Sequence, residues 1–103
     1  MANDTSRNGG LLWVLDTAAV ITTDKVRIAG LRWIDAGAVA GDAVTVEDAN
    51  GEIVWESVAT GPNYVESEHF GERGRDFNGF ELASIAAGGK LYVYHAEHSS
   101  GRI

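Results

Sequence analysis

The sequence AVTVEDANGEIVWES, at residues 43–57, carries the clearest folding signal in the chain. Asn50 and Gly51 at its centre tolerate the positive φ angles that tight hairpin turns require. Apolar and polar residues alternate on both sides of this turn, as they do in a strand with one buried face. The stretch therefore predicts a β-hairpin with strands at residues 43–47 and 53–57.

The alternation also predicts which side chains of the hairpin are buried. One face carries two valines of the first strand and two apolar residues of the second: Val44, Val46, Ile53 and Trp55. Glu47 and Glu56 are expected to point toward water.

The segments around the hairpin have the same character. They are short, rich in β-branched and aromatic residues, and separated by Gly, Asn and Asp. They predict further strands at residues 11–15, 20–23, 26–34, 64–70, 80–85 and 91–95. The segment 80–85 also fits a helix closed by Gly88 and Gly89, but its strand neighbours favour a strand. Gly30 indicates a bulge within its strand.

The fold class follows from this pattern of about seven or eight short strands. It predicts an all-β fold, either an antiparallel β-sandwich or a small barrel. No long segment of helical period separates the strands, so a βαβ architecture is disfavoured. The glycine-rich, charged segment 71–79 is expected to be a loop, with Arg73, Arg75 and Asp76 at its tip.

The length of 103 residues suits one domain with a single core. We expect the domain to cover residues 11–96. The polar residues 1–10 are expected to form a flexible arm, and the polar residues 97–103 a frayed tail.

The charge balance disfavours several classes of function. Fifteen acidic and eight basic residues give a net charge of −7, which opposes binding to the phosphates of nucleic acid. The chain has no cysteine, so it has no disulfide, zinc–thiolate site or thiol nucleophile. Its N-terminal residues lack the pattern of a signal peptide, and no apolar run is long enough to cross a membrane. We therefore expect a soluble protein made in the cytoplasm, with no nucleic-acid or membrane partner.

The histidines do not form a recognisable catalytic or metal-binding motif. His69, His95 and His98 lie near no Gly-x-Ser-x-Gly nucleophile motif. His95 and His98 have a spacing that suits metal ligands only on a helix, and this segment leaves a strand. We expect a solvated chain end there.

The acidic residues also favour structural roles. Glu66, Glu68 and Glu72 form a cluster beside His69, and a glycosidase would need two carboxylates placed across a sugar. The same spacing arises on any solvated strand face with two glutamates. Segment 48–52 resembles part of a calcium loop, but the hairpin accounts for all of its residues. The sequence thus predicts no catalytic, cofactor-binding or metal-binding residues, and no enzyme.

The aromatic residues leave two interpretations open. They could form a stacking platform for sugars, or they could pack in the core or against another subunit. The residues concerned are Trp13, Trp33, Trp55, Tyr64, Tyr92 and Tyr94. Tyr92 and Tyr94 share the strand face opposite Leu91 and Val93. Because both faces of that strand are apolar or amphipathic, another chain is expected to cover one of them.

Several of these segments together resemble small structural proteins of tailed bacteriophages. The resemblance runs from about Thr17 to Tyr94. It is carried by VITTD at 20–24, VRIAGLRW at 26–33, DANGEIVWESVA at 48–59 and GKLYVY at 89–94. These are strand and turn residues, and none of them is a catalytic signature.

The resemblance implies a virion protein that decorates or cements the capsid shell, located at the capsid surface after synthesis in the host cytoplasm. Such proteins bind the major capsid protein or another virion protein, commonly as homo-oligomers such as trimers. The resemblance brings no catalytic residues and no cofactor with it. The alternative hypothesis is a carbohydrate-binding or adhesin-type β-sandwich module, for example in a tail or receptor-binding apparatus.

Overall fold

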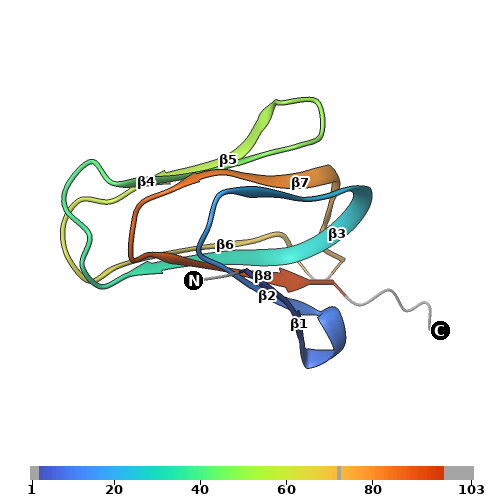
Figure 1. Ribbon diagram of the computed structural model, residues 1–103. Coiled ribbons are helices and arrows are strands. Elements are labelled where there is room, and N and C mark those ends of the chain that lie inside the picture. The colour runs from blue at the N-terminus through green and yellow to red at the C-terminus, as the bar shows by residue number, and fades with distance from the viewer. Residues whose placement is uncertain (1–2, 72, 97–103) are drawn as a thin grey trace.

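The computed structural model describes residues 3–71 and 73–96 (Figure 1). Its elements are β1 (Asp4–Arg7), the 3₁₀ turn η1 (Asn8–Gly10), β2 (Leu12–Leu15), β3 (Ala19–Asp35), β4 (Ala43–Glu47), β5 (Ile53–Val58), β6 (Tyr64–His69), β7 (Arg75–Ile85) and β8 (Lys90–His95). The eight strands pair antiparallel in the order β1-β2-β8-β3-β7-β4-β5, and β6 also pairs with β3. The predicted all-β antiparallel fold is confirmed, and so is the hairpin β4–β5.

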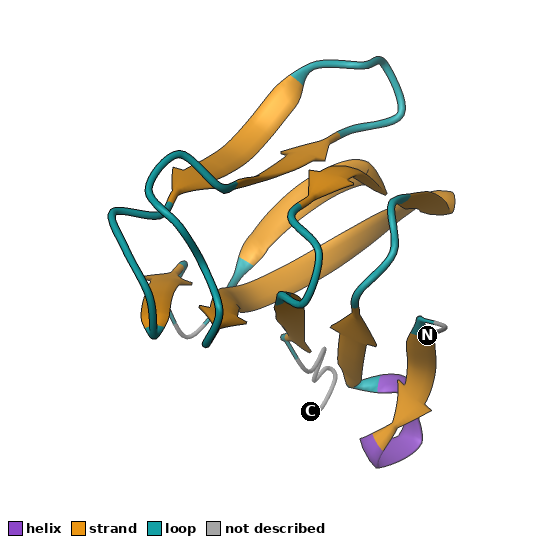
Figure 2. Ribbon diagram, turned by 60° about the vertical axis from the view of Figure 1, so that its left-hand side comes forward, coloured by secondary structure: helices purple, strands orange, loops and turns teal. Residues whose placement is uncertain are grey.

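The long strand β3 connects two layers of this sheet (Figures 1 and 2). Its residues 19–28 pair with β7, whereas residues 28–34 pair with β8 and residues 30–35 with β6. The layer β1-β2-β8-β3-β6 therefore faces the layer β3-β7-β4-β5, as in a small sandwich. The sequence predicted two separate strands here, at 20–23 and 26–34.

The bulge expected at Gly30 is present. The pairing of β3 with β8 shifts register between Ile28 and Gly30. A side chain at Gly30 would also be too close to β6, because a Cβ atom there would lie 2.9 Å from the backbone oxygen of Glu68. Glycine thus allows β6 to approach β3 at the point where β3 bends.

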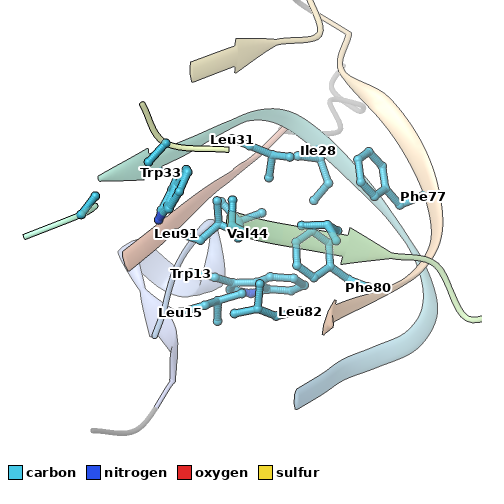
Figure 3. Close-up of a cluster of buried hydrophobic side chains, with 14 residues drawn as sticks. Trp13, Leu15, Ile28, Leu31, Trp33, Val44, Phe77, Phe80, Leu82 and Leu91 are labelled. Carbon is cyan, nitrogen blue, oxygen red and sulfur yellow. The ribbon is translucent and has the colours of Figure 1, made fainter. Parts of the chain in front are cut away.

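The core lies between the two layers (Figure 3). It consists of Trp13, Leu15, Ile28, Leu31, Trp33, Ala38, Val44, Val46, Ala59, Phe77, Phe80, Leu82, Leu91 and Val93. Trp13 of β2 meets Phe80 of β7 edge to face, with ring centroids 5.3 Å apart. This ring contact joins the layers directly, and burial of each such large side chain contributes about 1.5–3 kcal/mol to stability.

Gly89, in the turn before β8, lies close to polar atoms at one end of this core. A Cβ atom at Gly89 would lie 2.7 Å from Nε1 of Trp33 and 3.1 Å from Oδ2 of Asp35. Both side chains are almost fully buried. The turn before β8 can therefore pass Trp33 only because residue 89 has no side chain.

Two details of the predicted strands are wrong. Ile53 was expected on the buried face of the hairpin, but it is 57% exposed. The β4–β5 register shifts between Val46 and Glu47, so Ile53 pairs with Glu47 on the outer face. Arg75 and Asp76 were placed in a loop over 71–79, but β7 begins at Arg75, since Phe77 is buried and pairs with Val26 of β3.

The N-terminal residues also differ from the flexible arm predicted for 1–10. Strand β1 pairs with β2. Asn3, which precedes β1, hydrogen-bonds to the backbone that follows β2. Asn3 Oδ1 accepts hydrogen bonds from the backbone N–H groups of Asp16 and Thr17, at 2.9 and 3.0 Å. Composition does not reveal such side chain–backbone contacts between distant segments. The tail predicted for residues 97–103 lies outside the described residues.

Candidate functional site

The candidate catalytic residues are not brought together. His69 ends β6 and is exposed, whereas His95 ends β8 and packs edge-on against Trp13, with ring centroids 4.2 Å apart. His98 and Glu72 lie outside the described residues. Within residues 3–71 and 73–96, no three or more His, Asp or Glu side chains are grouped so as to hold a metal ion. The same residues contain no helix with the length and apolar character needed to span a bilayer.

The contacts of Glu66 indicate a structural role and not a catalytic one. Its Oε1 accepts hydrogen bonds from Ser57 Oγ of β5, at 2.5 Å, and from Tyr64 Oη, at 2.9 Å. The bond from Ser57, followed by that from Tyr64, lowers the pKa of Glu66. A carboxylate held ionised in this way is a poor general acid. Its role is to tie β5 to β6, at the open edges of the two layers.

His95 lies beside a hollow of about 370 Å³, which is lined by Leu11, Lys25, Val26, Arg27, Asp76, His95 and Ala96. Burial lowers the pKa of His95, so its neutral form is favoured. Arg27 is already engaged, because its Nε lies 3.1 Å from Asp76 Oδ1. The hollow therefore combines a neutral histidine with Lys25 and an internally paired arginine, and no serine, threonine or cysteine lines it.

The outer surface of the β8 layer offers a different kind of site. Opposite residues of a ladder share a face, so the register places Arg32 between Tyr92 and Ser67, and Ile34 between Lys90 and Val65. The neighbouring strand β2 adds Leu12 and Val14, opposite Tyr94 and Tyr92. We call this surface the tyrosine face: Leu12, Val14, Arg32, Ile34, Val65, Ser67, His69, Lys90, Tyr92 and Tyr94.

The tyrosine face is exposed, and apolar and aromatic side chains surround Arg32 on it. Tyr94 is 40% and Val65 is 49% exposed, whereas Leu91 and Val93 on the opposite side of β8 are fully buried. The alternation along β8 thus leaves an aromatic face uncovered. Large exposed apolar patches of this kind mark interaction sites more often than inert surface.

None of the ten residues of the tyrosine face is acidic, although the chain carries fifteen acidic residues; Asp4 of β1, which lies opposite Val14 at the border of the face, pairs with Arg7. Its charged groups are Arg32 and Lys90, and within the described residues neither has an ion-pair partner. Charge depletion with enrichment in tyrosine and arginine is the composition of the centre of protein interfaces. Charge therefore separates this face from the rest of the molecule.

A shallow hollow of about 270 Å³ lies at one end of the tyrosine face, over the backbone of Gly30. Its lining residues are Ala29, Gly30, Leu31, Arg32, Ser67, Glu68, His69 and Tyr94. Hydrogen-bonding groups thus surround one exposed aromatic ring, which is an arrangement that can hold a small polar ligand.

The tryptophans do not form an exposed row. Trp13 and Trp33 are buried in the core, and Trp55 is half-buried against it. Sequence alternation identified Tyr92 and Tyr94 as partners on one face. It missed Arg32, Ile34 and Val65 as their neighbours, because these come together only through the register of strands distant in the sequence.

Comparison of the chain with protein-family models, with curated proteins and with solved structures finds no match.

Proposed function

We propose that this chain is a non-enzymatic structural protein of a tailed-phage virion, which decorates or cements the capsid shell through protein–protein contacts. The observation that carries the proposal is the tyrosine face, an exposed aromatic and apolar surface whose unpaired charges are basic, on a protein of net charge −7. Covering such a face with protein removes apolar area from water and pairs its free cations.

The partners fit this proposal. The major capsid protein or another virion protein would cover part of the surface, and a second copy of the chain another part. Nucleic acid and membranes are not among the proposed partners, because the net charge opposes phosphate surfaces. The proposed location is the capsid surface, after synthesis in the host cytoplasm. The resemblance over Thr17 to Tyr94 supports the choice of a virion.

Co-sedimentation with empty capsid shells of the encoding phage tests the proposal. Wild-type protein is expected to pellet with the shells, and Val65→Asp, which puts an acid on the tyrosine face, is expected to reduce binding at least about tenfold. The matched control is Val39→Asp, since Val39 is 63% exposed but lies outside the tyrosine face. Failure of wild-type protein to bind the shells contradicts the proposal.

The hollow over Gly30 favours carbohydrate binding as the second candidate function. A sugar could stack on Tyr94 and exchange hydrogen bonds with Arg32, Ser67 and His69. A glycan array separates the two functions. Binding of one glycan class that is lost in Tyr94→Ala, with no binding to shells, would select the carbohydrate module.

A further inference from the structure

Part of the outer surface of the other layer, over β4, β5 and the neighbouring end of β7, is acidic, whereas Lys25 and Arg27 lie on the same side of this layer near the start of β7. Glu47 of β4 pairs with Glu81 of β7, and Thr45 pairs with Glu56 of β5, whose Oε2 accepts a hydrogen bond from Thr45 Oγ1 at 3.2 Å. Together with the apolar residues beside them, these define an acidic face: Val20, Thr45, Glu47, Ile53, Glu56, Val58 and Glu81. It contains no lysine and no arginine.

The acidic face is also apolar between its charges. Val20, Ile53 and Val58 are 59%, 57% and 51% exposed. In the described residues, Glu47 and Glu81 have no ion-pair partner. Each outer face therefore combines uncovered apolar side chains with unpaired charges, of opposite sign on the two layers.

We propose that the tyrosine face of one copy of the chain binds the acidic face of a second copy. This inference rests on the proposed function and names the partner of the tyrosine face. The contact places Arg32 and Lys90 against Glu47, Glu56 and Glu81, and covers the exposed apolar residues of both faces. Charge pairs beside covered apolar side chains give an interface both orientation and partner choice.

Charge decides between this arrangement and a symmetric dimer. Two tyrosine faces in contact would bring Arg32 and Lys90 of both copies together, and two acidic faces would bring six glutamates together. Like charges at a contact are costly. Contact between unlike faces avoids that cost and leaves the pair with one free tyrosine face and one free acidic face, so association continues until a ring closes or a filament forms.

The test uses one variant for each face. Val65→Asp adds an acid to the tyrosine face, and Ile53→Lys adds a base to the acidic face. Sedimentation velocity of wild-type protein at up to about 100 μM is expected to show species larger than a monomer. Each variant alone is expected to be monomeric at the same concentration, and Val39→Asp and Val39→Lys are expected to behave as wild type.

Mixing the two variants gives the decisive result. Val65→Asp keeps its acidic face and Ile53→Lys keeps its tyrosine face, so an equimolar mixture is expected to associate although neither variant does alone. A monomeric wild type, or a mixture that stays monomeric, overturns the proposal. Equal unfolding midpoints of the variants and wild type exclude misfolding as the cause.

The same samples separate this inference from the proposed function. If the protein associates head to tail but does not co-sediment with capsid shells, the inference stands and the proposed virion role is refuted. If the protein binds the shells but stays monomeric, the proposed virion role stands and the inference is refuted.

Discussion

Replacing Ser57 by alanine removes the hydrogen bond that joins β5 to the carboxylate of Glu66 on β6. A hydrogen bond to a charged group contributes about 1.5–3 kcal/mol when it is buried. Ser57 is buried, but Glu66 is partly exposed, so solvent screening reduces the expected loss to about 1 kcal/mol. For a domain of this size, that corresponds to a fall of roughly 4–8 °C in Tm.

The loss is expected to depend on pH. The hydrogen bonds of Glu66 lower its folded pKa below the ordinary value of 4.5. They therefore stabilise the fold fully above the unfolded pKa, and this contribution is lost as the pH falls through the folded pKa. The difference in unfolding free energy between wild type and Ser57→Ala should be largest at neutral pH and shrink in acid.

Urea unfolding followed by tryptophan fluorescence measures this difference, at about pH 7 and about pH 3.5. The control is Ser67→Ala, an exposed serine on β6 that is expected to have little effect at either pH. A double-mutant cycle with Glu66→Gln isolates the coupling between the two side chains. A pH-independent loss, or zero coupling in the cycle, would refute the reasoning.

Three further outcomes are expected in urea unfolding. Gly89→Ala forces a methyl group to within 2.7 Å of Trp33 Nε1 and should cost about 1–3 kcal/mol, whereas Gly37→Ala, with open space around it, should cost far less. Leu82→Ala leaves a cavity in the core and should cost about 2–5 kcal/mol; a smaller loss would mean that the layers repack. His95 has a folded pKa lowered by burial, so wild type should lose stability as the pH falls below the ordinary value of 6.5, and His95→Gln should lose less.

Local sequence patterns predicted the elements that depend on local chemistry. The hairpin β4–β5 follows from Asn50 and Gly51 and the alternation around them, and residues 80–85 belong to a strand, as their neighbours favoured. Ile53 was misplaced because a one-residue register shift moves a side chain to the other face. No local sequence pattern predicts that register shift.

Features that depend on distant pairing were not predictable. The sequence predicted a break between residues 23 and 26; the pairing with β7 does shift register between Thr22 and Lys25, but it resumes at Lys25 and β3 continues as one strand. Only part of the tyrosine face was predictable from the sequence. Tyr92 and Tyr94 alternate along one strand, whereas Arg32 and Val65 join them through the pairing of β3 with β8 and with β6. The acidic face was not predictable from the sequence, because Glu47 and Glu81 come together only through the pairing of β4 with β7.

The position of β3 in both layers has a consequence for the order of folding. All its partners, β6, β7 and β8, lie between Tyr64 and His95, so no part of β3 can pair until much of the chain has been synthesised. Closing such long loops before any pairing is gained makes folding slow, in the millisecond-to-second class typical of β-proteins with distant contacts. Among the described strands, the pairs β1–β2 and β4–β5 join neighbours in the chain and can form early. Truncation before β8 should therefore yield an unfolded chain and no stable fragment.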